Sequence, residues 1–162
     1  MLTSRRDYLL RIIDEVSRIL GMIVFKRRAG SDQEALETVV TGFQRLFGLE
    51  ADQIFLLTPD QHYAMLIDDE TSEFARDKVL LYAALSMEAG ELYAKMGNHF
   101  MARATRLNAL RFSLKARTDF PTDALPAYAP DIAKLLASLA DEPLDPITAD
   151  LLKASPPPSP PA

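Results

Sequence analysis

The chain of 162 residues contains no cysteine and no tryptophan, and its only histidines are His62 and His99. Without cysteine, disulfide bonds, thiolate metal sites and a cysteine nucleophile are excluded. The sequence also has no glycine-rich phosphate loop, no Gly-x-Ser-x-Gly elbow and no His-Glu-x-x-His pair, which are the common catalytic motifs. We therefore expect a protein that is not an enzyme and that uses no cofactor and no metal.

Basic charge and long apolar runs are lacking as well. The formal net charge is -5, so the chain has no overall attraction for the phosphate backbone of nucleic acids. No window approaches the roughly 20 apolar residues that a membrane span needs. Arg5 and Arg6 precede an apolar stretch, but Asp7 and Asp14 interrupt it, which argues against a signal peptide. We expect a cytoplasmic protein with no nucleic-acid partner and no membrane span.

Apolar residues recur at steps of three and four along most of the chain, and this spacing predicts an all-α protein. We expect a single helical domain over residues 1–154. Its expected parts are a helical hairpin over 4–47 with a capping box at Ser31 and Glu34, a short linker helix over 58–67 capped by Thr58, a second hairpin over 71–117, and short C-terminal helices within 121–153. Residues 155–162 are rich in proline and predict a flexible tail.

The two expected hairpins share a spacing of small residues, which indicates an internal repeat. Steps of five and seven separate the members of each set, which are Gly30, Ala35 and Gly42 in the first hairpin and Gly97, Ala102 and Ala109 in the second. Gly21 and Gly90 correspond in the preceding helices. Small residues at such positions would let two helix backbones approach closely.

The second hairpin resembles a tetratricopeptide repeat over residues 83 to 117. The residues that carry the resemblance stand at the spacing of the repeat signature and are Gly90, Tyr93, Gly97, Ala102 and Ala109. Ser86, Arg106 and Leu114 depart from that signature. The opening segment 6–11 is also similar to a small bacterial family known only as uncharacterised. The resemblance implies antiparallel hairpins stacked in a right-handed array.

Tetratricopeptide proteins bind peptides or partner helices along the groove formed by the first helix of each pair. Carried over by position, the resemblance implies a groove formed by Glu15, Arg18, Met22, Phe25, Lys26, Met87, Glu91 and Lys95. Large apolar residues on a polar stripe suggest a partner. The leading hypothesis is a protein-protein interaction module, a scaffold or adaptor. The alternatives are a structural homodimer that uses the same stripe, a stripe covered by the chain's own later helices, and a small-ligand-binding protein or enzyme.

The acidic run over residues 68–70 lies near His62 in the sequence and could contribute ligands to a cation. Its spacing matches no known metal-binding loop. Acidic side chains are also favoured at the start of a helix, where they meet the positive end of the helix dipole. We expect this second role for the run.

Overall fold

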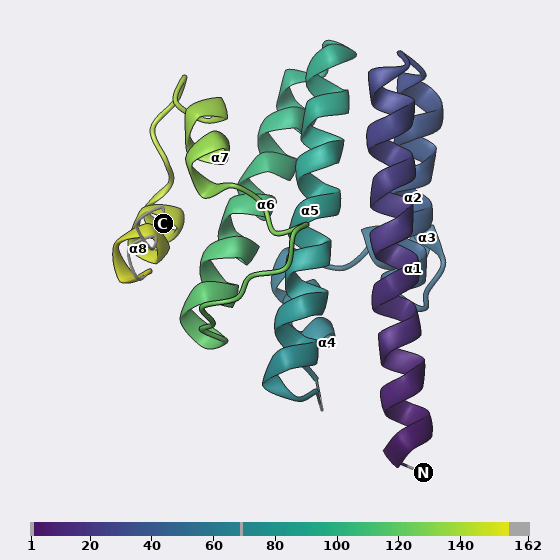
Figure 1. Ribbon diagram of the computed structural model, residues 1–162. Helices are drawn as coiled ribbons and strands as arrows, with labels where there is room; N and C mark the ends of the chain where they lie inside the picture. Colours follow the sequence, from purple (N-terminus) through teal and green to yellow (C-terminus); the bar gives the residue numbers. More distant parts are fainter. Residues whose placement is uncertain (1, 69, 156–162) are drawn as a thin grey trace.

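The computed structural model of the protein describes residues 2–68 and 70–155, and for residues 2–4 it describes the backbone alone. All regular elements in this part of the chain are helices, which confirms the predicted all-α class. They are α1 (Leu2–Arg28), α2 (Asp32–Phe47), α3 (Ala51–Phe55), α4 (Pro59–Ile67), α5 (Ser72–Lys95), α6 (His99–Asp119), α7 (Ile132–Ser138) and α8 (Pro146–Ala154). The long helices lie side by side, with α1 at one end of the array and α7 and α8 at the other (Figure 1).

The turns between α1 and α2 and between α5 and α6 have the same backbone geometry. Gly30 and Gly97 both adopt the left-handed conformation, with φ of 79° and 80°, which glycine alone reaches without steric cost. The residue after each glycine donates its backbone N–H to the carbonyl five residues earlier, Ser31 to Lys26 and Asn98 to Tyr93, both at 2.9 Å. Each helix therefore ends in a Schellman turn, and the chain reverses within a few residues.

The predicted capping box at Ser31 and Glu34 is wrong. The side chain of Ser31 accepts no capping hydrogen bond, and its backbone N–H already donates to Lys26 in the Schellman turn. That N–H is therefore not available to the Glu34 carboxylate. The predicted cap at Thr58 does form: its hydroxyl oxygen accepts from the Gln61 backbone N–H at 3.2 Å.

One helix was not expected, and several helix ends differ from the expected boundaries by one or two residues. The sequence did not predict α3, which begins with a capping box between Glu50 and Gln53 and buries only Ile54. A helix of five residues is too short to display a periodic apolar pattern. The first helix also begins at Leu2, two residues before the predicted start.

The main core surrounds α5, which packs against α1, α2, α4 and α6. The eight residues from Val79 to Ser86 are all buried, so α5 has no solvent face over two turns. A second, smaller core cluster joins α6 to α7 and contains Ala109, Leu110, Leu114, Leu135 and Leu139. The C-terminal helices α7 and α8 thus pack on the side of the array away from α1 (Figure 1).

Close helix contact explains two of the glycines. A Cβ added at Gly42 would lie 2.7 Å from Cδ2 of Leu85, and one added at Gly90 would lie 2.7 Å from Cγ of Arg106. A Cβ at Gly21 would meet nothing within 4 Å. A Cβ at Gly42 or Gly90 would therefore meet a side chain of a neighbouring helix, whereas one at Gly21 would not, and the predicted close approach of the helix backbones stays a prediction.

No described helix is long and apolar enough to cross a membrane. The predicted flexible tail lies outside the described residues, except for Ser155 at the end of α8.

Candidate functional site

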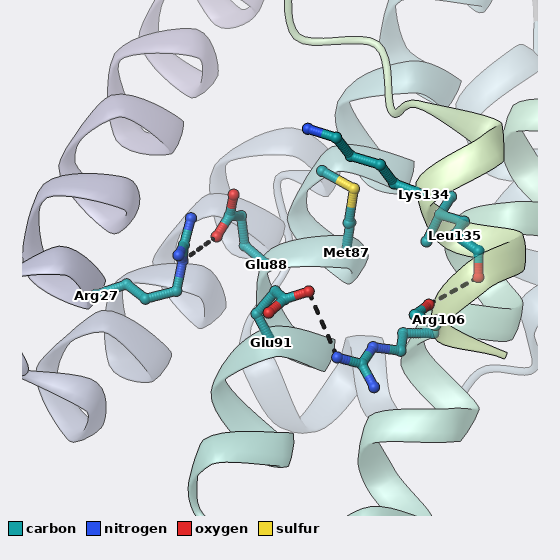
Figure 2. Close-up of a pocket in the computed structure, with 8 residues that line it drawn as sticks. Arg27, Met87, Glu88, Glu91, Arg106, Lys134 and Leu135 are labelled. Atoms are coloured by element: carbon teal, nitrogen blue, oxygen red, sulfur yellow. Dashed lines mark hydrogen bonds and ion pairs between the residues drawn. The ribbon is translucent and has the colours of Figure 1, made fainter. Parts of the chain in front are cut away.

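A cavity of about 260 Å³ opens between α1, α5, α6 and α7 (Figure 2). It is lined by Arg27 of α1, Met87, Glu88 and Glu91 of α5, Arg106 of α6, and Lys134, Leu135 and Ser138 of α7. We call this cavity the interhelical cleft. Of the eight residues predicted to form a groove, it contains Met87 and Glu91.

Two ion pairs form walls of the interhelical cleft. Nε of Arg27 lies 2.8 Å from Oε2 of Glu88, whose side chain is buried, so this pair joins α1 to α5. A terminal nitrogen of Arg106 lies 3.4 Å from Oε1 of Glu91 and joins α5 to α6. Removing one partner of a buried pair leaves an uncompensated charge, so Arg27 and Glu88 hold each other in place, whereas Glu91 of the second pair is exposed.

The remaining lining residues combine apolar surface with one positive charge. Leu135 is buried, and Met87 is partly buried against the smaller core cluster. Lys134 is exposed and reaches from α7 over the interhelical cleft toward Met87 (Figure 2). Within the described part of the chain, its ammonium group has no ion-pair or hydrogen-bond partner. The lining has three cations and two carboxylates, which leaves a net charge of +1.

The residues predicted on α1 lie elsewhere. Glu15 forms an ion pair with Arg45 of α2, which lowers the pKa of the Glu15 carboxyl. Lys26 donates to the Thr38 hydroxyl of α2 at 3.0 Å. Arg18 pairs with Asp14 one helical turn away, at 2.8 Å. Glu15 and Lys26 therefore face α2, and neither lines the interhelical cleft.

The predicted apolar residues of α1 are open to solvent. The exposed fraction is 50% for Met22 and 74% for Phe25. The alternative in which later helices cover them is therefore wrong, because α7 and α8 pack on α6 instead. We define the outer stripe of α1 as Tyr8, Arg11, Glu15, Arg18, Met22 and Phe25.

Lys95 connects the two Schellman turns. Its ammonium group donates to Oδ1 of Asp32 at 2.9 Å and to the carbonyl oxygen of Arg27 at 3.3 Å. Its charge is thus satisfied within the chain, where it joins the end of α5 to the turn between α1 and α2.

Four charged residues of the interhelical cleft were not predicted from the sequence, and they are Arg27, Glu88, Arg106 and Lys134. The only signal was Arg106, which departs from the aromatic position of the repeat signature. The position of Lys134 depends on the path of the loop between α6 and α7, for which the sequence has no periodic pattern.

The histidine of the suspected cation site has a structural role. Nε2 of His62 lies 2.7 Å from the Ile54 carbonyl oxygen and must donate to it, and Nδ1 lies 3.1 Å from the Tyr82 hydroxyl oxygen. Burial raises the pKa of Tyr82 to about 12. Among the described residues, no three acidic or histidine side chains are grouped to hold a metal ion, and Asp69 lies outside them.

The carboxylate of Glu70 also has partners within the chain. It lies 3.3 Å from Arg5 and 3.7 Å from Lys78. It therefore joins the start of α1 to α5.

Comparison of the chain with family models, with curated proteins and with solved structures finds no match.

Proposed function

We propose that the protein is an interaction module that binds a peptide segment of a partner protein in the interhelical cleft. The observation that carries this proposal is the exposed Lys134 ammonium group, which has no partner in the described chain and extends over apolar surface from Met87 and Leu135. The resemblance to tetratricopeptide proteins supports the same class of function.

The proposed ligand is a peptide that carries an acidic side chain next to a large apolar one. Arg27 and Arg106 are already paired with glutamates, so Lys134 is the cation left to meet a carboxylate. The cavity of about 260 Å³ is smaller than the roughly 300–1,000 Å³ of pockets for drug-sized ligands. One apolar side chain of the peptide fits this volume beside Met87.

We further propose that α1 with α2 and α5 with α6 are two hairpins of a tetratricopeptide-like array. The equivalent Schellman turns at Gly30 and Gly97 support this. So do the contacts that α5 makes with both helices of the preceding hairpin. Membership of the small bacterial family stays a prediction.

Selection of peptides from a random displayed library against the immobilised full chain tests the proposed function. We expect enrichment of peptides that pair an acidic with an apolar residue. Lys134→Glu should weaken their binding roughly tenfold, because it places a like charge against the ligand carboxylate. Lys153→Glu is the matched control, since it makes the same change at an exposed lysine of α8. Failure to enrich such peptides, or equal binding to both variants, would refute the proposal.

A further inference from the structure

The outer stripe of α1 has the spacing of a coiled-coil seam. Its six residues follow one another at steps of three, four, three, four and three, which are the alternating a and d positions of a heptad repeat. The buried side of α1, which carries Val16 and Ile23, packs against α2 and α5, and Glu15 stands at the edge of the stripe where it reaches Arg45 of α2. All three apolar members are exposed: Tyr8 at 55%, Met22 at 50% and Phe25 at 74%. A seam of this kind matches the face of another helix.

The stripe is complementary to itself in one orientation. If a second copy of α1 runs antiparallel, each stripe residue faces a stripe residue of the other copy. The numbers of two facing residues then add to 33. This pairing places Tyr8 opposite Phe25, Arg11 opposite Met22, and Glu15 opposite Arg18. A parallel pair in register would instead place Glu15 opposite Glu15 and Arg18 opposite Arg18, which charge repulsion disfavours. The charges therefore select the antiparallel orientation.

We propose that two copies of the protein associate through this stripe, with antiparallel α1 helices and a two-fold axis that passes between Val16 and Ser17. Each contact then occurs twice, as a closed symmetric dimer requires. The stripe runs about 26 Å along the helix from Tyr8 to Phe25, at 1.5 Å per residue. This surface differs from the interhelical cleft, so the dimer does not depend on the proposed peptide binding.

The aromatic and charged layers have different roles in this dimer. Tyr8 and Phe25 form a ring pair at each end of the seam. Burial of such a pair on association stabilises the complex. Glu15 and Arg18 already have intrachain partners, Arg45 and Asp14, and these pairs are solvent-exposed. Exposed ion pairs add little to affinity. The central layer therefore sets register and orientation, and the aromatic ends stabilise the complex.

Sedimentation of the full chain at protein concentrations of about 5 to 300 µM tests the dimer. Weak association through a small interface is expected in this concentration range. Wild type should move from monomer to dimer as the concentration rises. Glu15→Arg alone places arginine opposite arginine, and Arg18→Glu alone places glutamate opposite glutamate, so each variant should sediment as a monomer. An equimolar mixture of the two restores opposite charges in both central contacts and should form a heterodimer.

The control is Glu37→Arg, which reverses an exposed glutamate on α2 outside the stripe and should dimerise like wild type. Circular dichroism checks that every variant keeps its helices. A wild-type chain that stays monomeric throughout the range overturns the proposal. Single variants that dimerise normally overturn it too, as does a mixture of the two that stays monomeric.

Discussion

At the scale of single residues, Gly42 shows how one absent methyl group permits a helix crossing. Alanine at this position would place Cβ 2.7 Å from Leu85, which is fully buried, and 3.3 Å from Ile19. Alanine gains about 1 kcal/mol of helix propensity over glycine, but overpacking a core costs about 1–3 kcal/mol. We expect Gly42→Ala to lower the free energy of unfolding by about 1 kcal/mol, measured by urea denaturation.

Gly21→Ala is the matched control in the neighbouring helix. A Cβ at Gly21 meets nothing within 4 Å, so only the helix propensity changes. We expect this variant to be more stable than wild type by about 0.5–1 kcal/mol. A Gly42→Ala protein that is stabilised as much as Gly21→Ala would show that α2 and α5 are not in close contact at this point.

The sequence could indicate that small residues mattered, but not which of them lie at a helix contact. Gly42 and Gly21 both stand within predicted helices, and only the three-dimensional crossing of α2 over α5 distinguishes them. Local chemistry was equally ambiguous at Ser31. Its backbone N–H could serve the turn before it or the helix after it, and the Schellman turn takes it.

At the scale of elements, α8 is held to α6 by a small polar network. Arg111 of α6 donates to the Asp145 carboxylate at 2.9 Å and to the Thr148 hydroxyl at 2.8 Å. Asp145 also caps α8 by accepting the Thr148 backbone N–H at 3.1 Å. Partial burial raises the pKa of Asp145, but the hydrogen bonds from Thr148 and Arg111 outweigh it and lower the pKa to about 2.

This lowered pKa predicts an acid-sensitive attachment of α8. The Asp145 carboxylate has a lower pKa in the folded than in the unfolded chain. Its contribution to the stability of the folded chain is therefore fully present above pH 4 to 5. It is lost as the pH falls toward 2. Between pH 5 and pH 3, wild type should therefore lose more stability than Asp145→Asn, as measured by the urea midpoint at each pH. Equal losses in the two proteins would contradict the role given to Asp145.

Elements with several turns were predictable because their apolar spacing reports on burial. The two long hairpins begin and end within about two residues of the predicted positions. In contrast, α3 was missed, because one buried side chain, Ile54, makes no pattern. The last helices were expected within a proline-rich region, where the prolines mark the breaks. The sequence there does not show against which helix each piece packs.

At the scale of the whole molecule, we expect the parts of the chain around the two core clusters to unfold locally and independently of each other. Leu139 is buried in the smaller cluster between α6 and α7, and truncating a buried leucine costs about 2–5 kcal/mol. We expect Leu139→Ala to speed hydrogen exchange of backbone amides in α7 and α8 while those of Val79–Leu92 in α5 keep their protection. Mass spectrometry of the exchanged peptides measures both regions in one experiment.

Val16→Ala provides the opposite case. Val16 is fully buried in the main core, so its truncation should lower protection across α1, α2 and α5. If Leu139→Ala lowers protection equally in all helices, the two clusters unfold as one unit and the separation is wrong.

To predict the groove residues correctly from the resemblance, one must know how α1 is rotated about its axis relative to its neighbours. Both α2 and α5 pack on the core side of α1, so residues opposite the core, such as Met22 and Phe25, point away from the array. Residues beside the core, such as Arg27, face α5 instead. The periodic pattern identifies the buried side of a helix, but it does not tell which neighbour lies on which flank. The sequence therefore indicated Met87 and Glu91 of the cleft but missed its other charged residues.

The central position of α5 has a consequence for synthesis. The ribosome makes α1, α2 and α4 before it makes α5, against which their apolar sides pack. At about 5–20 residues per second, the 24 residues of α5 take roughly one to five seconds to be added. During that interval the nascent N-terminal helices have no central helix to enclose, so the newborn chain is most exposed to wrong associations just before it acquires its core.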